Sequence, residues 1–493
     1  MADLYYEAML YLFQYLKLRM MKIEQLYTGC LAEAAYYIES NGEVAIIDPL
    51  RDVDTYIQKA KDNNATIKYI FETHFHADFV SGHIDLAAKT GATIVYGPTS
   101  MKTGFDSYIG KDNEVFNLGG VTIKLIHTPG HTMESSCFLL SDEQGKETAL
   151  FTGDTLFIGD VGRPDLAQKV IADLTQDKLA RHLFHSLRDK IITLSDEIIV
   201  YPGHGAGSAC GKNMSKETID TLGHQKEVNY ALRASMTEEE FVIEVLDGLT
   251  PPPGYFPQNV LLNIQGYNAF DEVKSKGIKA LNAVNFELLA NETDAVILDT
   301  REANSFVHGF IPNAINIGID GNFAVWAGTL IPDVKQPILL VCDKGREEEV
   351  VTRLARVGYD NTLGYLENGI EAWKNAGKEI DTIAYISPEE LATKMKTETV
   401  NLVDVRKASE YKSERVKQAN NAPLDYVNES MLLIHKDEPT YIYCAGGYRS
   451  VVFISILQAR GYRNLINVTD GFGAMKRTQQ FQLTDYICPT TLL

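Results

Sequence analysis

The stretch Thr73-His74-Phe75-His76-Ala77-Asp78, which follows an apolar run at residues 67–71, decides how the first half of this chain is interpreted. Three further apolar runs also lead into potential metal ligands, namely His131, Asp154 and His204. In layered α/β proteins the carboxyl ends of strands meet at one edge, where loops hold ligands above a rigid sheet. One His-x-His pair alone would be weak evidence. Four strand ends that carry His or Asp predict one metal site on one rim.

Length and charge limit the classes of protein that remain. At 493 residues the chain is too long for one hydrophobic core, and about three domains are expected. The formal net charge of -20 disfavours nucleic acid and anionic membrane surfaces as partners, because both reward clustered Lys and Arg. No apolar run approaches the roughly 18 residues that are needed to span a bilayer. Six cysteines without C-x-x-C spacing indicate reduced thiols, so we expect a cytoplasmic protein. Separately, we expect the chain to form a homo-oligomer.

A triple proline at 251–253 predicts a linker, because such a run favours extended, non-helical backbone. Before it, short apolar strands alternate with helical stretches, and we place the first domain at residues 21–255. Residues 1–20 form an N-terminal extension without the basic start and cleavage site of a signal peptide. We assign this extension no function.

An internal repeat follows the linker. Residues 295–301 (AVILDTR) are echoed by residues 400–406 (VNLVDVR), and residues 337–342 (PILLVC) are echoed by residues 439–444 (PTYIYC). Two copies of one α/β domain, each a parallel sheet with helices on both faces, fit this pattern. We place the copies at residues 256–383 and 384–493.

The ligand order in the first domain resembles the metallo-β-lactamase superfamily, in which T-H-x-H-x-D is followed by separate His, Asp and His residues. The resemblance implies an αββα sandwich. Hydrolases of this superfamily, such as glyoxalase II, extend the first motif by a further His that helps to bind a second metal. That position is Phe79 here, and Phe has no lone pair to offer a metal.

Residues 152–157 (TGDTLF) and 159–165 (GDVGRPD) are similar to the persulfide dioxygenase branch of the superfamily, whose members hold one iron with two His and one Asp. The resemblance implies one Fe(II) per chain, bound by His74, His131 and Asp154. Two His and one carboxylate leave open positions for a persulfide and O₂. The resemblance also implies a surrounding set that orients ligands and water, namely His76, Asp78 and His204.

Arg163 has two open interpretations. Either it binds the carboxylate or phosphate end of a thiol cofactor, or it pairs with Asp160 or Asp165. Cys210, which follows His204 closely, is interpreted as structural.

Cys444 opens the loop CAGGYRS, which follows an apolar strand and precedes a helical stretch. Backbone N–H groups, the helix N-terminus and Arg449 all favour a thiolate there. The loop resembles that of the rhodanese family, in which the cysteine carries a transferable sulfur as a persulfide, so Cys444 and Arg449 are the catalytic residues implied. Phosphatases on the same fold carry a loop one residue longer, so sulfur transfer is favoured over dephosphorylation.

The first copy departs from this pattern. After Cys342 the loop reaches Arg346 one residue early, and Glu347-Glu348-Glu349 then begins the next helical stretch. Three carboxylates beside the loop oppose a thiolate and repel anions such as sulfite or thiosulfate. This copy is similar to a degenerate rhodanese domain.

The domain order resembles bacterial fusion enzymes that join a persulfide dioxygenase to a degenerate and an active rhodanese domain. The implied reactions are oxidation of a low-molecular-weight persulfide by O₂ to thiol and sulfite, and sulfur transfer that forms or uses thiosulfate, in sulfide detoxification. The thiol carrier is left open between glutathione, coenzyme A and others. One alternative is a dinuclear thioester hydrolase of the glyoxalase II type fused to a sulfurtransferase, and another is a non-catalytic sulfur carrier or sensor.

Overall fold

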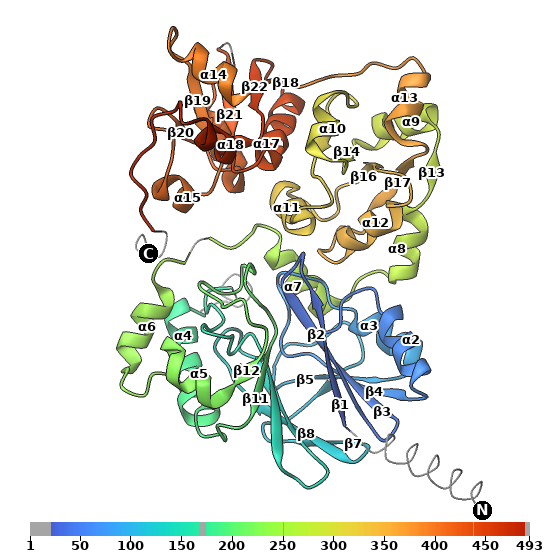
Figure 1. Cartoon of the computed structure of the whole chain (residues 1–493). Coiled ribbons are helices and arrows are strands. Elements are labelled where there is room, and N and C mark those ends of the chain that lie inside the picture. Colours follow the sequence, from blue (N-terminus) through green and yellow to red (C-terminus); the bar gives the residue numbers. More distant parts are fainter. Residues whose placement is uncertain (1–20, 167–173, 250, 437, 489–493) are drawn as a thin grey trace, which may run out of the picture. The chain divides into compact units, whose positions relative to one another are not determined.

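The computed structural model describes residues 21–166, 174–249, 251–436 and 438–488, so the N-terminal extension expected at 1–20 lies outside the described residues. The chain divides into two compact units (Figure 1). The first runs to Phe270 and includes Ala355–Gly358, and the second comprises Asp271–Leu354 and the chain from Tyr359. Among the described residues, no helix combines the length and the apolar character that a membrane crossing requires.

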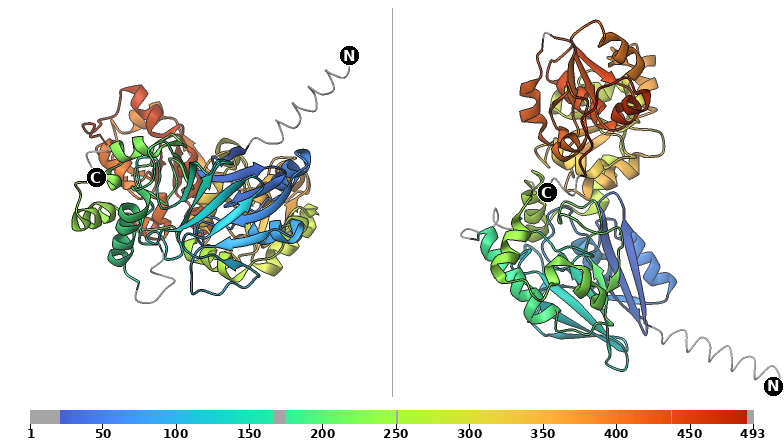
Figure 2. Two further views of the ribbon diagram at one scale, coloured as in Figure 1. Left: turned by 90° about the horizontal axis from the view of Figure 1, so that it is seen from below. Right: turned by 60° about the vertical axis from the view of Figure 1, so that its left-hand side comes forward.

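The first unit contains two six-stranded sheets, drawn in blue and in cyan to green in Figure 2. The first sheet is mixed and follows chain order: β1 (Lys22–Thr28), β2 (Glu33–Ser40), β3 (Glu43–Ile47), β4 (Thr66–Phe71), β5 (Thr93–Tyr96) and β6 (Tyr108–Ile109). The second is mostly antiparallel, again in chain order: β7 (Val115–Leu118), β8 (Val121–His127), β9 (Ser136–Ser141), β10 (Glu147–Gly153), β11 (Ile199–Pro202) and β12 (Asp220–Thr221). The helices are α2 (Asp54–Asp62), α3 (His83–Thr90), α4 (Gln176–His185), the π-helix η2 (Ser186–Ile191), α5 (Leu222–Val228), the 3₁₀-helix η3 (Tyr230–Leu232), α6 (Glu238–Leu246) and α7 (Phe256–Gln265).

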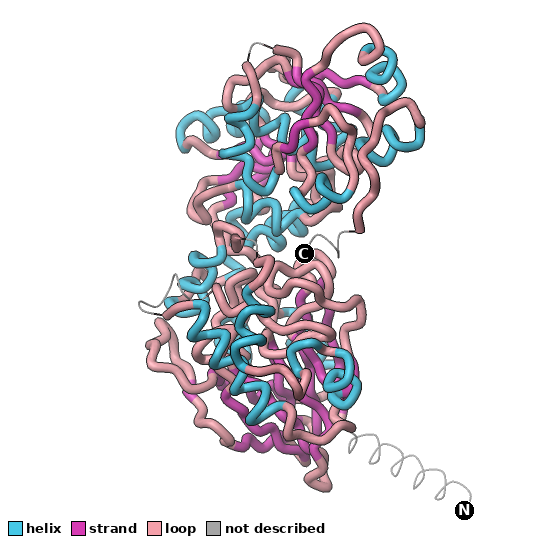
Figure 3. Tube along the Cα trace, turned by 90° about the vertical axis from the view of Figure 1, so that its left-hand side faces the viewer, coloured by secondary structure: helices cyan, strands magenta, loops and turns pink. Residues whose placement is uncertain are grey.

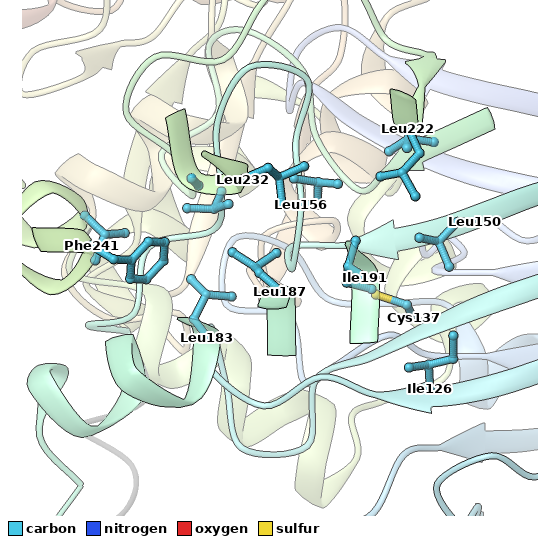
Figure 4. Close-up of a cluster of buried hydrophobic side chains, with 14 of the residues drawn as sticks. Ile126, Cys137, Leu150, Leu156, Leu183, Leu187, Ile191, Leu222, Leu232 and Phe241 are labelled. Atoms are coloured by element: carbon cyan, nitrogen blue, oxygen red, sulfur yellow. The ribbon is translucent and has the colours of Figure 1, made fainter. Parts of the chain in front are cut away.

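Alternation of side chains along the strands builds four layers. On β2, Tyr36 and Ile38 face the second sheet, while Ala35 and Tyr37 face the helices on the other side. The outer face of the second sheet packs on α4, η2, α5 and α6, and Figure 4 shows this cluster, which includes Leu183. Each buried Leu of this kind contributes about 1.5–3 kcal/mol relative to exposure. Helix–sheet–sheet–helix packing confirms the predicted αββα sandwich.

The strands that precede the candidate ligands do not share one sheet. β4 lies in the first sheet, whereas β8, β10 and β11 lie in the second. β8 and β10 are each antiparallel to β9, and β10 is parallel to β11, so β8, β10 and β11 point the same way. The expectation of one sheet rim is therefore wrong, because the site lies where the edges of two stacked sheets meet.

The first compact unit extends beyond the expected boundary at residue 255. Helix α7, which follows the proline linker, packs on the first sheet through Ile264. Its Asn263 donates from Nδ2 to the backbone oxygens of His76 and Phe79, at 2.8 Å each, and accepts from the backbone N–H of Ser81 at 2.9 Å. The helix satisfies backbone groups of the ligand-bearing loop, which is why it belongs to the first unit.

The second unit contains two parallel five-stranded sheets of the same strand order, magenta in Figure 3, and this confirms the repeated α/β fold. The first copy orders its strands β13-β17-β16-β14-β15, and the second orders them β18-β22-β21-β19-β20. The first copy contains α8 (Phe270–Gly277), β13 (Ala280–Leu281), α9 (Ala283–Thr293), β14 (Val296–Asp299), α10 (Ala303–Val307), β15 (Ile315–Asn316), α11 (Phe323–Leu330), β16 (Ile338–Val341), α12 (Glu347–Ala355), β17 (Thr362–Leu366) and α13 (Gly369–Asn375). The second copy contains β18 (Ala384–Ile386), α14 (Pro388–Lys394), β19 (Asn401–Asp404), α15 (Ala408–Ser413), β20 (Asn420–Asn421), η4 (Leu424–Tyr426), α16 (Val427–Ser430), η5 (Met431–Leu433), β21 (Thr440–Tyr443), α17 (Tyr448–Ala459), β22 (Leu465–Val468) and α18 (Gly471–Thr478).

Candidate metal centre and sulfur-transfer loop

Two glycines let the ligand loops of the first unit approach one another. Gly153 ends β10 with φ at +49°, a left-handed conformation, and a Cβ there would lie 2.5 Å from the Thr73 side chain. A Cβ on Gly203 would lie 2.8 Å from Asp154 Oδ1. Only residues without a side chain fit at these two points, so the glycines bring the loops after β4, β10 and β11 together.

His74, His131 and Asp154 converge at this junction. Their ligand atoms all lie within 4.8 Å of one another, and all three side chains are buried. Nε2 of His131 lies 3.4 Å from Asp154 Oδ2, and Nε2 of His74 lies 4.0 Å from the same oxygen. His74 Nε2 and Asp154 Oδ2 are buried without a hydrogen-bond partner among the described residues. Buried polar atoms without partners are costly, and a metal ion in their midst would satisfy them.

Hydrogen bonds behind the two imidazoles fix which nitrogen faces the site. His131 Nδ1 lies 2.9 Å from the carbonyl oxygen of Arg163, which can only accept, so Nδ1 carries the proton. Thr73 Oγ1 donates its hydrogen to Asp48 at 2.8 Å, so it accepts from His74 Nδ1 at 3.0 Å. Both Nε2 atoms therefore present lone pairs to the site. Burial, followed by the neighbouring His76, also holds the pKa of His74 well below its usual value, which favours this neutral form.

His204 holds the carboxylate of Asp154 in place. Its Nδ1 lies 2.8 Å from Asp154 Oδ1, and its Nε2 lies 2.7 Å from Asp78 Oδ2. Burial alone would lower the pKa of His204, but the two carboxylates raise it well above its usual value. Burial likewise opposes ionisation of Asp154, but His204, through its charge and its hydrogen bond, holds the pKa of this carboxyl well below its usual value. An ionised Asp154 thus directs Oδ2 at the two imidazoles.

His76 lies outside this group, although only one residue separates it from His74. Its Nε2 lies 3.0 Å from Asp48 Oδ1 and 3.4 Å from Glu72 Oε2, in a second buried cluster. Against the effect of burial, these two carboxylates raise the pKa of His76 well above its usual value. The ring of Phe79 packs on the other side of His76, with the ring centroids 4.3 Å apart. Because its Nε2 points at Asp48 and Glu72, His76 is not presented as a ligand to the first group.

Two further residues of the sequence analysis lie near the site. Arg163 pairs with Asp165 through Nε at 2.6 Å and Nη2 at 2.7 Å and is only 4% exposed, a geometry that favours the pairing interpretation. Its role in cofactor binding stays a prediction. Cys210 lies with Asp78 and His204, their ligand atoms within 4.8 Å of one another. Burial, followed by the charges of Asp78 and Asp154, raises the pKa of the Cys210 thiol well above the usual value.

In the second unit, Cys444 lies at the end of β21, and its loop curls around the sulfur. The backbone N–H of Gly447, whose φ is +96°, donates to Cys444 Sγ at 3.1 Å. Ser450 Oγ lies 3.7 Å from the same sulfur, but its single hydrogen has a nearer acceptor in the carbonyl oxygen of Gly447, at 3.1 Å. Arg449 forms two hydrogen bonds with Glu410, at 2.6 and 2.9 Å. Burial would raise the pKa of Glu410, but Arg449 lowers it. The N–H of Gly447 favours charge on the sulfur, and Glu410 fixes the direction of the guanidinium.

The matching loop of the first copy has the opposite character. Burial and the carboxylates of Glu347, Asp299 and Asp343 raise the pKa of Cys342 to about 12. The guanidinium of Arg346 is held by Glu349 at 2.9 Å and by Asp320 at 2.8 Å. Cys342 therefore stays a thiol at neutral pH, as the sequence analysis expected of a degenerate copy.

Three residues that shape these sites were not predicted from the sequence. Asp48 and Glu72, which hold His76, each directly follow a strand, so the strand-end argument that singled out the ligands also applies to them. Glu410 lies six residues after Asp404, where the first copy has Ser305 in place of Glu. Comparing the two copies position by position would have identified it.

Comparisons with known proteins agree with this architecture. The family model described as the metallo-β-lactamase superfamily matches residues 28–204, and the rhodanese-like domain model matches residues 283–376 and 387–478. A probable hydroxyacylglutathione hydrolase of Schizosaccharomyces pombe is 30% identical over 202 residues, which cover 40% of this chain and 73% of the relative.

Among solved structures, a metallo-β-lactamase from Staphylococcus aureus is similar, with 33% identity and a TM-score of 0.62, over 70% of this chain and 99% of that chain. The crystal structure of ETHE1 from Myxococcus xanthus matches over 50% of this chain and 99% of that chain, with 26% identity and a TM-score of 0.42, too low to transfer details of a site. The matched families follow the same order as the two units, with the buried ligand group inside the first match. The chain belongs to the metallo-β-lactamase superfamily, and rhodanese-like domains follow its metallo-β-lactamase domain.

Proposed function

We propose that the first domain is a mononuclear iron dioxygenase that acts on a low-molecular-weight persulfide, and that the second rhodanese copy transfers sulfur at Cys444. The separation of His76 from the group of His74, His131 and Asp154 carries the proposal for the first domain. Two imidazoles that direct Nε2 at the site and one carboxylate form the ligand set that suits Fe(II) in oxygenases. His76, engaged with Asp48, is withdrawn from that set.

The proposed oxidation is RSSH + O₂ + H₂O → RSH + SO₃²⁻ + 2 H⁺. The outer sulfur loses four electrons and O₂ accepts four. Bound Fe(II) would supply open positions where the persulfide sulfur and O₂ meet. The protein's own contribution is orientation: Thr73 and the carbonyl of Arg163 fix the two imidazoles, and His204 fixes the carboxylate of Asp154. The persulfide, with glutathione or coenzyme A as its thiol, is the substrate class, and the setting is sulfide detoxification in the cytoplasm.

The proposed transfer step regenerates the cysteine: Cys444–S–S⁻ + SO₃²⁻ → Cys444–S⁻ + S₂O₃²⁻. The bond between the two sulfurs breaks, and a new S–S bond forms to sulfite. The N–H of Gly447 stabilises the negative sulfur that leaves. Arg449, held by Glu410, contributes positive charge for the incoming sulfite.

Elemental analysis together with O₂ uptake on glutathione and coenzyme A persulfides tests the first activity. We expect about one iron per chain and O₂ uptake that is lost in Asp154→Ala, because the carboxylate completes the ligand set. Glu197→Ala, at an exposed carboxylate of the same unit, is the matched control and should keep full uptake. Iron-loaded protein that consumes no O₂ with any persulfide would refute the proposal.

A second candidate is a dinuclear thioester hydrolase, because the S. pombe relative is named a hydroxyacylglutathione hydrolase. Phe79, packed on His76, opposes it by removing a ligand for the second metal. Hydrolysis of a glutathione thioester by protein holding two zinc ions per chain would establish this candidate in place of the dioxygenase.

A further inference from the structure

Helix α17, which begins at the Cys444 loop, is buried on all sides. Nine consecutive residues, 450–458, are buried. A helix that covers one sheet normally keeps a solvent face, and α12 of the first copy does so through residues such as Glu348. Another element must therefore cover the face of α17 that its own sheet leaves open.

Residues 316–321 of the first rhodanese copy, which we call the wall segment, supply part of this cover beside α10. The backbone N–H of Asn316 donates to Ser455 Oγ at 3.0 Å, and the hydroxyl of Tyr448 donates to the carbonyl oxygen of Gly318 at 3.0 Å. A Cβ on Gly321 would lie 3.0 Å from Cε2 and Cζ of Tyr448, so the ring rests directly on glycine backbone. The wall segment thus contacts α17 at its first residue and again two turns later.

The first copy uses its own altered loop to hold the wall segment. Arg346, the arginine that follows Cys342 one position early, donates to the carboxylate of Asp320 at 2.8 Å. Arg353, in the last turn of α12, donates to the carbonyl oxygen of Ile319 at 2.7 Å. The backbone N–H groups of Ile317 and Ile319 donate to Asp299 and Thr300. Arg346 in the altered Cys342 loop and Arg353 after it therefore hold the wall segment where it contacts the second copy.

On its other side, Tyr448 is part of the sulfur-binding loop. It lies between Gly447, whose N–H donates to Cys444 Sγ, and Arg449, which Glu410 holds. Gly447 has a positive φ and no side chain to anchor it, so the position of the Tyr448 ring restricts the peptide that points at the sulfur.

We propose that Tyr448 is a positioning residue through which the inactive first copy holds the sulfur-transferring loop of the second. This inference rests on the proposed role of Cys444. It assigns the degenerate copy a function in the transfer reaction, although Cys342 takes no part in it. The hydroxyl of Tyr448 binds Gly318, and its effect on the sulfur passes through the peptide of Gly447.

The test approaches the same contact from both copies. Tyr448→Phe removes the hydrogen bond to Gly318 and keeps the ring, and Gly321→Ala crowds the ring from the opposite side. Tyr462→Phe is the matched control for the first, because its hydroxyl donates to the carbonyl oxygen of Met431 at 3.3 Å, away from the loop. Gly309→Ala matches the second, since its Cβ would lie 3.2 Å from Ile380 Cγ2.

The readouts are kcat/KM for thiosulfate–thiol transfer between pH 6 and 9, the unfolding temperature, and O₂ uptake by the first domain as a check of folding. We expect Tyr448→Phe to lower kcat/KM at pH 7 about threefold to tenfold, the scale of one hydrogen bond. The acidic limb of its pH profile should move to higher pH, because a displaced Gly447 N–H stabilises the thiolate less. Gly321→Ala should do the same, and both controls should match the unaltered protein.

Three results would overturn the inference or its basis. Unchanged pH profiles in Tyr448→Phe and Gly321→Ala would refute the positioning role, even if the unfolding temperature fell. An equal loss in Tyr462→Phe would show a general effect of tyrosine hydroxyls in this domain. Transfer activity retained by Cys444→Ser would refute the proposed function itself, whatever Tyr448 does. Tyr448→Phe is isosteric, so the test remains available if Gly321→Ala does not fold.

Discussion

The contrast between the two cysteine loops yields a quantitative prediction about alkylation. Both thiols are buried, with 5% of Cys342 and 1% of Cys444 exposed, so access favours neither. With its pKa raised to about 12, Cys342 is thiolate in about 1 molecule in 10,000 at pH 8, and only the thiolate reacts. A cysteine with the ordinary pKa near 8.5 is about one-quarter thiolate at that pH, a difference of about 2,000-fold.

The pH dependence separates charge from access. Between pH 8 and 10 the thiolate fraction of Cys342 should rise about 100-fold, because this fraction increases about tenfold for each pH unit while the pH stays below the pKa of about 12. An ordinary thiol gains only about fourfold over the same range, since it is already ionised near pH 9. Iodoacetamide labelling followed by peptide mass spectrometry measures both slopes, with the exposed Cys488 as the internal reference.

Two outcomes would refute this reasoning. One is labelling of Cys342 at pH 8 within tenfold of Cys488, and the other is a labelling rate for Cys342 that levels off below pH 10. In the transfer assay, Cys342→Ser should keep thiosulfate–thiol activity and Cys444→Ser should lose it. The reverse pattern would show that the two copies have been assigned the wrong way round.

Three further predictions concern the surroundings of the two sites. His204→Asn should weaken iron binding about 10–100-fold, because it releases the carboxylate of Asp154. Competition with a chelator measures the affinity for iron. The control His224→Asn, which breaks a surface pair with Asp220, should leave that affinity unchanged. Glu410→Gln should raise KM for thiosulfate about threefold to tenfold with a smaller change in kcat, because the guanidinium of Arg449 loses its fixed direction. An unchanged KM would exclude this role for Glu410. Cys444→Ser should still consume O₂ with a persulfide but release sulfite where the intact protein releases thiosulfate, and identical product ratios would show that the two steps are not coupled.

Much of the fold and of the site follows from local sequence patterns. The order of His74, His131, Asp154 and His204 after apolar runs is visible because the end of a strand is a local feature of the chain. The repeat and the shortened Cys342 loop are equally local, since each depends on the spacing of a few neighbouring residues. Such patterns predict the layered α/β architecture and the group of candidate ligands.

Tertiary packing decided what local patterns leave open. His74 and His76 are two residues apart on one loop, yet one faces Asp154 and the other faces Asp48. Their directions depend on which sheet each side chain meets, because the ligand-bearing strands come from two stacked sheets rather than from one. The spacing of residues within the motif does not separate the two histidines; only the family resemblance gave them different roles before the contacts were seen.

The sequence by itself determined the fold family, the repeated domain and the residues that could bind a metal or carry sulfur. Each of these is encoded in periodicity and spacing along the chain. Only the tertiary structure decided that α7 belongs with the first unit, that Glu410 holds Arg449, and that Tyr448 rests on the wall segment. The physical reason is that a contact between distant segments depends on the surface that each presents after folding. Gly321 is an example: in the sequence it is one glycine among many, and only in the folded protein does its lack of a side chain let the Tyr448 ring rest against its backbone.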